Sequence, residues 1–91
     1  MVFKVLIHKR ALKELEEIPE PYRTQIRVAI TEMAQDPFSG DVKPIKGLKG
    51  VLRKRVGRYR IGFTVDFEKG TVVVLKVGLS EKFYEKQNRK K

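Results

Sequence analysis

The sequence predicts one small α+β domain in which two helices cover one face of a four-stranded, mostly antiparallel sheet. Apolar residues alternate in the first seven positions, recur every three or four positions up to residue 35, and alternate again after residue 50. The order strand, helix, helix, strand, strand, strand brings both helices to one face of the sheet. A chain of 91 residues is enough for one hydrophobic core of this kind, so residues 1–91 are expected to form a single domain.

The first half of the chain predicts a strand followed by a helical hairpin. Alternating apolar positions indicate a short strand over residues 2–7 with one buried side. The apolar period then becomes helical, and Pro19 ends the first helix. Pro21 suits the start of a second helix, whose apolar stripe continues until Pro37.

The second half predicts a loop and then a three-stranded antiparallel meander. Residues 38–50 are rich in glycine, with proline, serine and aspartate, which is typical of a connecting loop. Strands are expected over residues 51–56, 59–67 and 71–79, joined by hairpin-length turns. The last strand is apolar at nearly every position, which is typical of a strand covered on both faces. Residues 82–91 form a basic C-terminal tail.

The net charge of +10 lies entirely in the second half of the chain. Residues 1–45 contain seven basic and seven acidic residues, whereas residues 46–91 contain fourteen basic and four acidic residues. Seven of these cations fall within residues 46–60, which contain no Asp or Glu. Their mutual repulsion favours a polyanion such as nucleic acid as the normal partner. The alternative is an ordinary solvated surface, as most charge runs are.

Alternation within the predicted strands places three of these cations on one surface. Arg53 and Arg55 share a face of their strand, with Lys54 on the opposite face. Arg60 leaves the polar side of the next strand, so a simple register brings the three guanidinium groups together. Guanidinium groups stay charged at physiological pH and present rigid pairs of donors to phosphate. The neighbouring cations are candidate RNA contacts that would extend this surface: Lys46, Lys49, Arg58 and Lys82.

The composition excludes several kinds of site. There is no cysteine and one histidine, so neither a thiolate nucleophile nor an ordinary zinc site is expected, and no cofactor is implied. Asp66 and Glu68 lie at a turn and do not form the acidic cluster of a metal-dependent nuclease. No apolar run approaches the ~20 residues of a membrane span, and the N-terminus lacks signal-peptide features. We therefore expect a cytoplasmic protein without membrane contact.

Metal-free RNA cleavage is compatible with this inventory. In that reaction the ribose 2′-hydroxyl attacks its own 3′ phosphate while cations stabilise the charge on the phosphoryl oxygens. His8 lies at the junction of strand and helix, where a helix-start or surface role is commoner than general base catalysis. Tyr84 is the better polar candidate, and it would stack on a base, transfer a proton or pack the tail against the sheet. A flat RNA-binding module fits the composition equally well.

Several segments resemble the RelE branch of the RelE/ParE toxin superfamily. The likeness extends over almost the whole chain and includes the segments ALKEL at 11–15, IKGL at 45–48, RKRVGRYRI at 53–61 and VVLKVG at 73–78. The most specific piece is the Val-Gly-x-Tyr-Arg-Ile core within residues 56–61, whereas the helical hairpin is generic.

This resemblance implies a type II toxin that enters the ribosomal A site and cleaves messenger RNA. It implies that Arg53, Arg55 and Arg60 surround the scissile phosphate, that Lys46 contacts the RNA backbone, and that Tyr84 orients the substrate or stacks on it. It also implies an acidic, RelB-like antitoxin that holds the toxin inactive. Such an antitoxin would fold a helix across the sheet or displace the C-terminal tail, and operator DNA would be bound only through it.

Two positions depart from the family pattern. Well-studied members have a lysine as general base where this chain has Arg55, which holds its proton too tightly to accept another at pH 7. Many members have a basic residue as general acid directly after the Val-Gly of the last strand, where this chain has Leu79 and Ser80. The nearest cation beyond is Lys82. The sequence therefore predicts catalysis that depends mainly on electrostatic stabilisation and on positioning by the ribosome.

Two other functions are compatible with the same resemblance. A ParE-like inhibitor of DNA gyrase would share the fold without needing RNA-cleaving arginines. A catalytically degenerate homologue would bind RNA without cutting it, and Ser80 is the chief reason to consider this reading.

Overall fold

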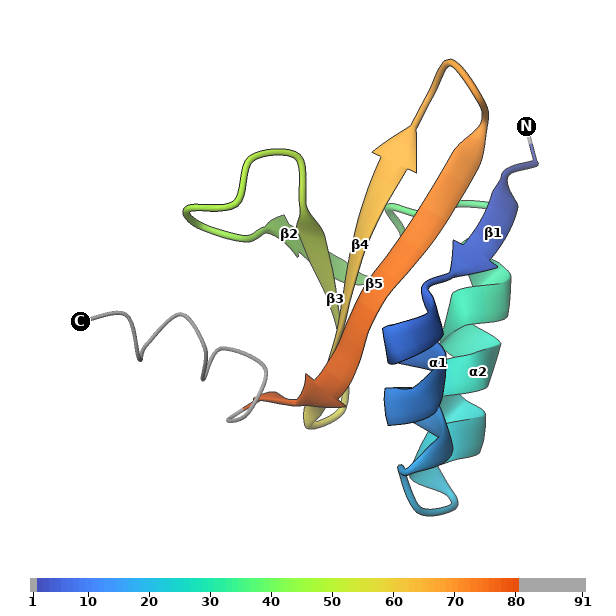
Figure 1. The fold of residues 1–91 in the computed structure, drawn as a ribbon, viewed down its shortest axis with the longest axis vertical. Helices are drawn as coiled ribbons and strands as arrows, with labels where there is room; N and C mark the ends of the chain where they lie inside the picture. Colours follow the sequence, from blue (N-terminus) through green and yellow to red (C-terminus); the bar gives the residue numbers. More distant parts are fainter. Residues whose placement is uncertain (1, 81–91) are drawn as a thin grey trace.

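The computed structural model describes residues 2–80, and the predicted tail over residues 82–91 lies outside this part of the chain (Figure 1). The described part contains two helices and five strands. In chain order these are β1 (Lys4–Ile7), α1 (Lys9–Glu16), α2 (Tyr22–Glu32), β2 (Asp41–Pro44), β3 (Leu52–Val56), β4 (Tyr59–Asp66) and β5 (Thr71–Leu79).

The strands form one mixed sheet in the order β1-β5-β4-β3-β2. The two strands β1 and β5 are parallel, and every other neighbouring pair is antiparallel. Both helices lie on the same side of the sheet, with α1 packed against β5 and α2 contacting β3 (Figure 1). The α+β class, the helical hairpin and the antiparallel meander predicted from the sequence are confirmed.

The strand β2 corrects the prediction of a four-stranded sheet, because its residues were expected to belong to a loop. It pairs with β3 over four positions, from Asp41 opposite Arg55 to Pro44 opposite Leu52. Only Val42 gives this segment an apolar side chain, and the nearby glycines and prolines are typical of loops. A short edge strand tolerates such residues because only one side of it needs hydrogen-bond partners.

The hydrophobic core lies between the helices and one face of the sheet. Alternation in β4 predicts which residues face the helices, and Tyr59, Ile61 and Phe63 are indeed buried there. The helices and the residues just after them contribute the other half of this core: Ala11, Leu15, Ile18, Ile26, Ala29, Ile30 and Met33. The expectation that β5 is covered on both faces is wrong in the described structure. Val72, Val74 and Val77 are buried, but the residues between them are only half-buried because no described helix covers the other face.

Side chains fix the starts of both helices. His8 is the N-cap of α1, and its Nδ1 accepts a hydrogen bond from the backbone N–H of Arg10 at 3.1 Å. This is the helix-start role that the sequence favours for His8. Before α2, the carboxylate of Glu20 accepts hydrogen bonds from the hydroxyl of Thr24 at 2.7 Å and from its backbone N–H at 3.1 Å. The hydroxyl bond is the main cause that lowers the pKa of Glu20.

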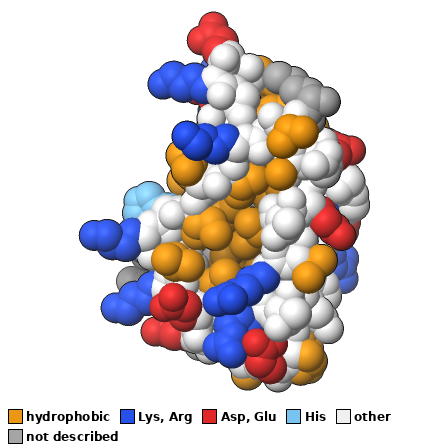
Figure 2. Space-filling model, turned by 90° about the vertical axis from the view of Figure 1, so that its right-hand side faces the viewer, with side chains coloured by type: hydrophobic (Ala, Val, Ile, Leu, Met, Phe, Trp, Pro, Cys, Tyr) orange, Lys and Arg blue, Asp and Glu red, His pale blue; other side chains and the backbone are white. Residues whose placement is uncertain are grey.

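The helix side of the molecule carries charges of both signs around an apolar area (Figure 2). Half-exposed apolar side chains of the helices include Leu12 of α1 and Val28 of α2. Acidic and basic residues are balanced in the first half of the chain, which forms both helices. The excess positive charge therefore has to be sought on the other face of the sheet.

Candidate functional site

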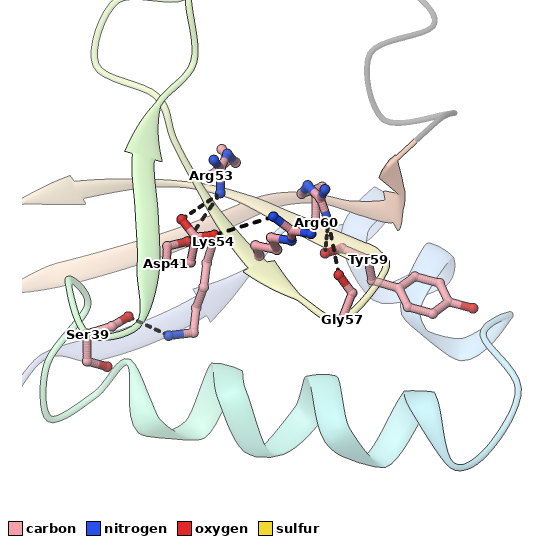
Figure 3. Close-up of polar contacts among 8 residues, drawn as sticks. Ser39, Asp41, Arg53, Lys54, Gly57, Tyr59 and Arg60 are labelled. Atoms are coloured by element: carbon pink, nitrogen blue, oxygen red, sulfur yellow. Dashed lines mark hydrogen bonds and ion pairs between the residues drawn. The ribbon is translucent and has the colours of Figure 1, made fainter.

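The face of the sheet that points away from the helices carries the three predicted arginines. In the β3–β4 register, Lys54 lies opposite Ile61 on the helix side. The neighbours of Lys54 in β3 are Arg53 and Arg55, which must point to the opposite side because side chains alternate along a strand. Arg60 alternates with the buried residues of β4 in the same way and lies directly opposite Arg55. In Figure 3, Arg53 and Arg60 project from one side of the sheet, and Lys54 projects from the other.

Arg55 and Arg60 form a like-charged pair across two neighbouring strands. Directly opposed residues have Cβ atoms about 4.5–5.5 Å apart, and like charges in this position are destabilising. The side chain of Arg55 is 56% exposed, so its guanidinium is open to solvent. Two arginines whose Cβ atoms lie this close can both direct donors to one anion, and a phosphate group would relieve their repulsion.

Backbone carbonyls orient the side chain of Arg60. Its Nη1 donates hydrogen bonds to the carbonyl oxygens of Tyr59 at 3.0 Å and Gly57 at 3.3 Å (Figure 3). Both acceptors lie at the β3–β4 turn, and Gly57 there has a φ of 61°. The turn thus holds one end of the Arg60 guanidinium and directs it along the open face.

Asp41 is a site residue that sequence reasoning missed. It lies directly opposite Arg55 in the β2–β3 register and therefore shares the open face. Its backbone oxygen and Oδ1 accept hydrogen bonds from Arg53 Nη1 at 3.3 Å and 3.2 Å, and its Oδ2 lies 3.9 Å from Arg55 Nη1. The charge run of residues 46–60 was expected to lack acidic partners, but β2 supplies one from outside the run. The available signal was the polar-apolar-polar alternation around Val42.

Lys54 takes no part in the cationic face. Its side chain is buried, with a residue exposure of 6%, and Nζ donates a hydrogen bond to the carbonyl oxygen of Ser39 at 2.6 Å. This bond connects β3 to the segment that leads into β2. Lys54 therefore has a structural role within the charge run, because it positions β2 beside β3.

A substitution at Gly40 tests whether the contact between Lys54 and Ser39 stabilises the fold. Gly40 has a φ of 81°, and a Cβ built there would lie 2.7 Å from Lys54 Nζ. We expect Gly40→Ala to lower the free energy of unfolding by roughly 1–3 kcal/mol, through backbone strain and displacement of the ammonium from Ser39. Urea unfolding of the purified protein measures this loss.

Gly47→Ala is the matched control for that measurement. Gly47 has a φ of 86°, but a Cβ built there has nothing within 4 Å. It should therefore lose only the backbone part, about 1 kcal/mol. Equal losses at the two positions would contradict a role for the Lys54 contact.

The remaining predicted RNA contacts lie at both ends of β3. Lys46 and Lys49 are exposed in the loop that connects β2 to β3, and Arg58 is exposed in the β3–β4 turn. The structure therefore places them on either side of the arginines along the strand direction. Tyr84 and Lys82 lie outside the described residues.

A groove of about 330 Å³ lies on the helix side of the sheet, between α1 and the end of β5. Its walls include Tyr59, Ile18 and Leu79, and acidic and basic side chains lie at its edges. Within the described residues 2–80, pairing between β1 and β5 ends at Val74 and does not continue along the rest of β5. Glu14 of α1 accepts a hydrogen bond from the backbone N–H of Val77 at 2.9 Å. The sequence alone did not locate this groove.

Neither a metal site nor a membrane-spanning helix is found in the described part of the chain. Residues 2–80 contain no group of three His, Cys, Asp or Glu side chains that could hold a metal ion. The helices of this part are too short and too polar to cross a bilayer.

Comparisons with known proteins agree on one class. A family model described as the ParE toxin of type II toxin-antitoxin systems, parDE, matches residues 5–84. A curated protein of Methanocaldococcus jannaschii that bears the name toxin RelE1 is 30% identical over 87 residues, covering 92% of this chain and 97% of that protein.

Solved structures show the same fold. The toxin-antitoxin complex RelBE2 from Mycobacterium tuberculosis matches with a TM-score of 0.79 and 25% identity, covering 87% of this chain and 99% of that one. The RelB-RelE antitoxin-toxin complex from Methanococcus jannaschii matches with a TM-score of 0.73 and 30% identity, covering 89% and 96%.

Proposed function

The chain belongs to the ParE and RelE family of toxins of type II toxin-antitoxin systems, and we propose that it is a ribosome-dependent, metal-independent endonuclease that cleaves translated messenger RNA. The observation that carries this proposal is the pair of Arg55 and Arg60, directly opposed on the open face of the sheet. Two arginines that are direct cross-strand neighbours suit the phosphate of a single-stranded RNA backbone.

In the proposed reaction the RNA supplies its own nucleophile. The 2′-oxygen of the ribose forms a bond to the adjacent phosphorus, and the bond from phosphorus to the 5′-oxygen of the next nucleotide breaks. The nucleophile loses a proton and the leaving oxygen gains one, so the products are a 2′,3′-cyclic phosphate and a 5′-hydroxyl. Arg55 and Arg60 would stabilise the negative charge that develops on the phosphoryl oxygens.

The arginines of the proposed site are poor proton-transfer groups. A guanidinium does not accept a proton at pH 7, so Arg55 would act by charge alone. Ser80 follows β5 where a basic general acid would be expected, and its N–H donates to the Arg58 carbonyl oxygen at 2.9 Å. We propose that the ribosome aligns the 2′-hydroxyl with the phosphate and that Tyr84 orients the substrate, since alignment contributes greatly to such reactions.

The proposed partners follow from charge and from the relatives. Lys46, Lys49, Arg58 and Lys82 would contact the RNA backbone around the arginines. The solved relatives from M. tuberculosis and M. jannaschii are complexes with antitoxins. A chain with a net charge of +10 suits an acidic antitoxin of the RelB type, with operator DNA bound only through it. Because ribosomes are cytoplasmic, the proposed activity is cytoplasmic as well.

A reconstituted translation reaction tests the proposal. Purified toxin should cut an mRNA inside translated codons when ribosomes are present, and primer extension maps the cuts. An mRNA with a 2′-deoxynucleotide at a mapped site should resist cleavage there, because the nucleophile is missing. Cleavage that persists at the 2′-deoxy site, or that is equally fast without ribosomes, would contradict the proposed mechanism.

A second candidate function is inhibition of DNA gyrase. It is favoured by the family model, whose description is that of ParE toxins. A supercoiling assay with purified gyrase separates the two functions. Loss of supercoiling together with intact mRNA in the translation reaction would support the ParE-like function. A toxin that acts in neither assay but still binds RNA would support the catalytically degenerate reading.

A further inference from the structure

We propose that Asp41 divides the three arginines by role: it retains Arg53 as a positioning residue and leaves Arg55 to bind RNA phosphate beside Arg60. This inference rests on the proposed function and deepens it, because it assigns different tasks to residues that look equivalent in the sequence. It also adds Asp41, which comes from the unpredicted strand β2, to the working parts of the site.

Arg53 is already engaged in the folded protein. The two N–H groups of its Nη1 have two acceptors on Asp41, the backbone oxygen at 3.3 Å and Oδ1 at 3.2 Å (Figure 3). The side chain is 15% exposed, which leaves little of it for an arriving ligand. These contacts span from β3 to β2, a four-residue edge strand that is also held by backbone pairing and by the bond from Lys54 to Ser39. Arg53 thus secures the edge of the open face.

Arg55 is in the opposite situation, although it neighbours the same carboxylate. The distance of 3.9 Å from its Nη1 to Asp41 Oδ2 is too long for a hydrogen bond. Its side chain is 56% exposed, nearly four times the fraction of Arg53. Among the described residues its guanidinium makes no hydrogen bond, and Arg60 lies directly opposite on β4. The acceptors of Arg60 Nη1 are neutral backbone carbonyls, not a carboxylate, so its charge is not neutralised. Asp41, Arg55 and Arg60 form one row across β2, β3 and β4. A phosphate that reaches this row therefore contacts Arg55 and Arg60.

Asp41 also has an electrostatic effect on this row. Asp41, Arg55 and Arg60 lie side by side on three neighbouring strands. The carboxylate offsets part of the repulsion between the two arginines, which lets them stay close before any anion arrives. Its weak contact with Arg55 is easily exchanged for a phosphate, whereas its bonds to Arg53 are not. The RNA should therefore gain two phosphate-binding arginines from this face, not three.

Salt-dependent binding measures how many cations contact phosphate. The probe is a 2′-O-methyl RNA oligonucleotide bound to the full-length toxin. Its methylated 2′-oxygens cannot act as nucleophiles, so the probe is bound but not cleaved. Arg53→Gln and Arg55→Gln are matched variants that each remove one charge from the same face of β3. Arg55→Gln should reduce the steepness of log affinity against log salt by roughly 0.7, the value for one phosphate contact on a single strand. Arg53→Gln should reduce it by less than half as much.

Unfolding equilibria measure how strongly each arginine is coupled to Asp41 in the folded protein. In a double-mutant cycle with Asp41→Ala, Arg53→Gln should show a coupling of about fivefold in the unfolding equilibrium constant. Arg55→Gln should show a smaller coupling to the same substitution. Equal changes in salt dependence for the two arginine variants, or stronger coupling of Arg55 to Asp41, would overturn the division of roles.

These outcomes are distinguishable from failure of the proposed function. A wild-type toxin that binds the oligonucleotide with the predicted pattern of variants but never cleaves mRNA would refute the nuclease and support the division. A toxin that cleaves mRNA while Arg53→Gln and Arg55→Gln weaken salt dependence equally would refute the division alone. Binding of the wild-type toxin that does not depend on salt would refute both.

Discussion

Replacing Arg60 with alanine should slow mRNA cleavage by roughly 10²- to 10³-fold, the cost of losing one preorganised donor at a site of developing negative charge. Arg60 is held by the carbonyl oxygens of Tyr59 and Gly57, so its guanidinium is oriented before RNA binds. Catalysis gains most from groups that need no rearrangement when the charge develops. The measurement is the single-turnover rate in the reconstituted translation reaction.

Arg27→Ala is the matched control for this prediction. Arg27 is exposed on α2, on the helix side of the sheet, so its replacement removes the same charge from the opposite face. It should leave the cleavage rate within about twofold, because surface substitutions away from such sites have small effects. Equal losses for Arg27→Ala and Arg60→Ala would show that net charge, not the position of Arg60, determines the activity.

Replacing Phe63 with alanine should lower the free energy of unfolding by about 3–5 kcal/mol. Phe63 has an exposure of 0% and lies on the middle strand of the sheet, where β4 pairs with both β3 and β5. The loss combines the transfer free energy of the ring with the cavity left in the core. For a small domain this is a large share of a total stability of about 5–15 kcal/mol. Urea unfolding of the free toxin measures it.

Phe67→Ala provides the control on the same side of the sheet. Phe67 directly follows β4 and is 62% exposed, although its ring stacks against Phe38 with centroids 5.9 Å apart. Its replacement should cost about 1 kcal/mol or less. A loss at Phe63 no larger than the loss at Phe67 would contradict the assignment of Phe63 to the centre of the core.

The alternation of apolar and polar residues in the strands predicted most of the fold and of the candidate site. In β4, the period of two separated Tyr59, Ile61 and Phe63 from Arg60, and the structure buries the first three against the helices. The same period in β3 separated Arg53 and Arg55 from Lys54. Because hairpin-length turns fix the register of neighbouring strands, the shared face of the arginines followed from these local patterns.

Features that depend on distant parts of the chain could not be predicted in this way. The strand β2 has one apolar residue, and its pairing with β3 is visible only when both strands are placed in the sheet. The contact of Asp41 with Arg53 joins residues twelve positions apart, and the bond of Lys54 to Ser39 joins residues fifteen apart. The groove at the end of β5 arises because β1 is shorter than β5. Apart from the short polar-apolar-polar alternation around Val42, none of these features leaves a periodic signal.

The most direct test of the account is the rate of ribosome-dependent cleavage by Arg55→Ala, Arg60→Ala and the double variant. If the two guanidinium groups stabilise one phosphate, removing the second after the first should cost much less than it costs alone, because groups that act as a unit are strongly non-additive. The account predicts a double variant within about tenfold of the slower single variant. Losses that multiply in full, or a wild-type rate in either single variant, would contradict a shared phosphate site on the open face.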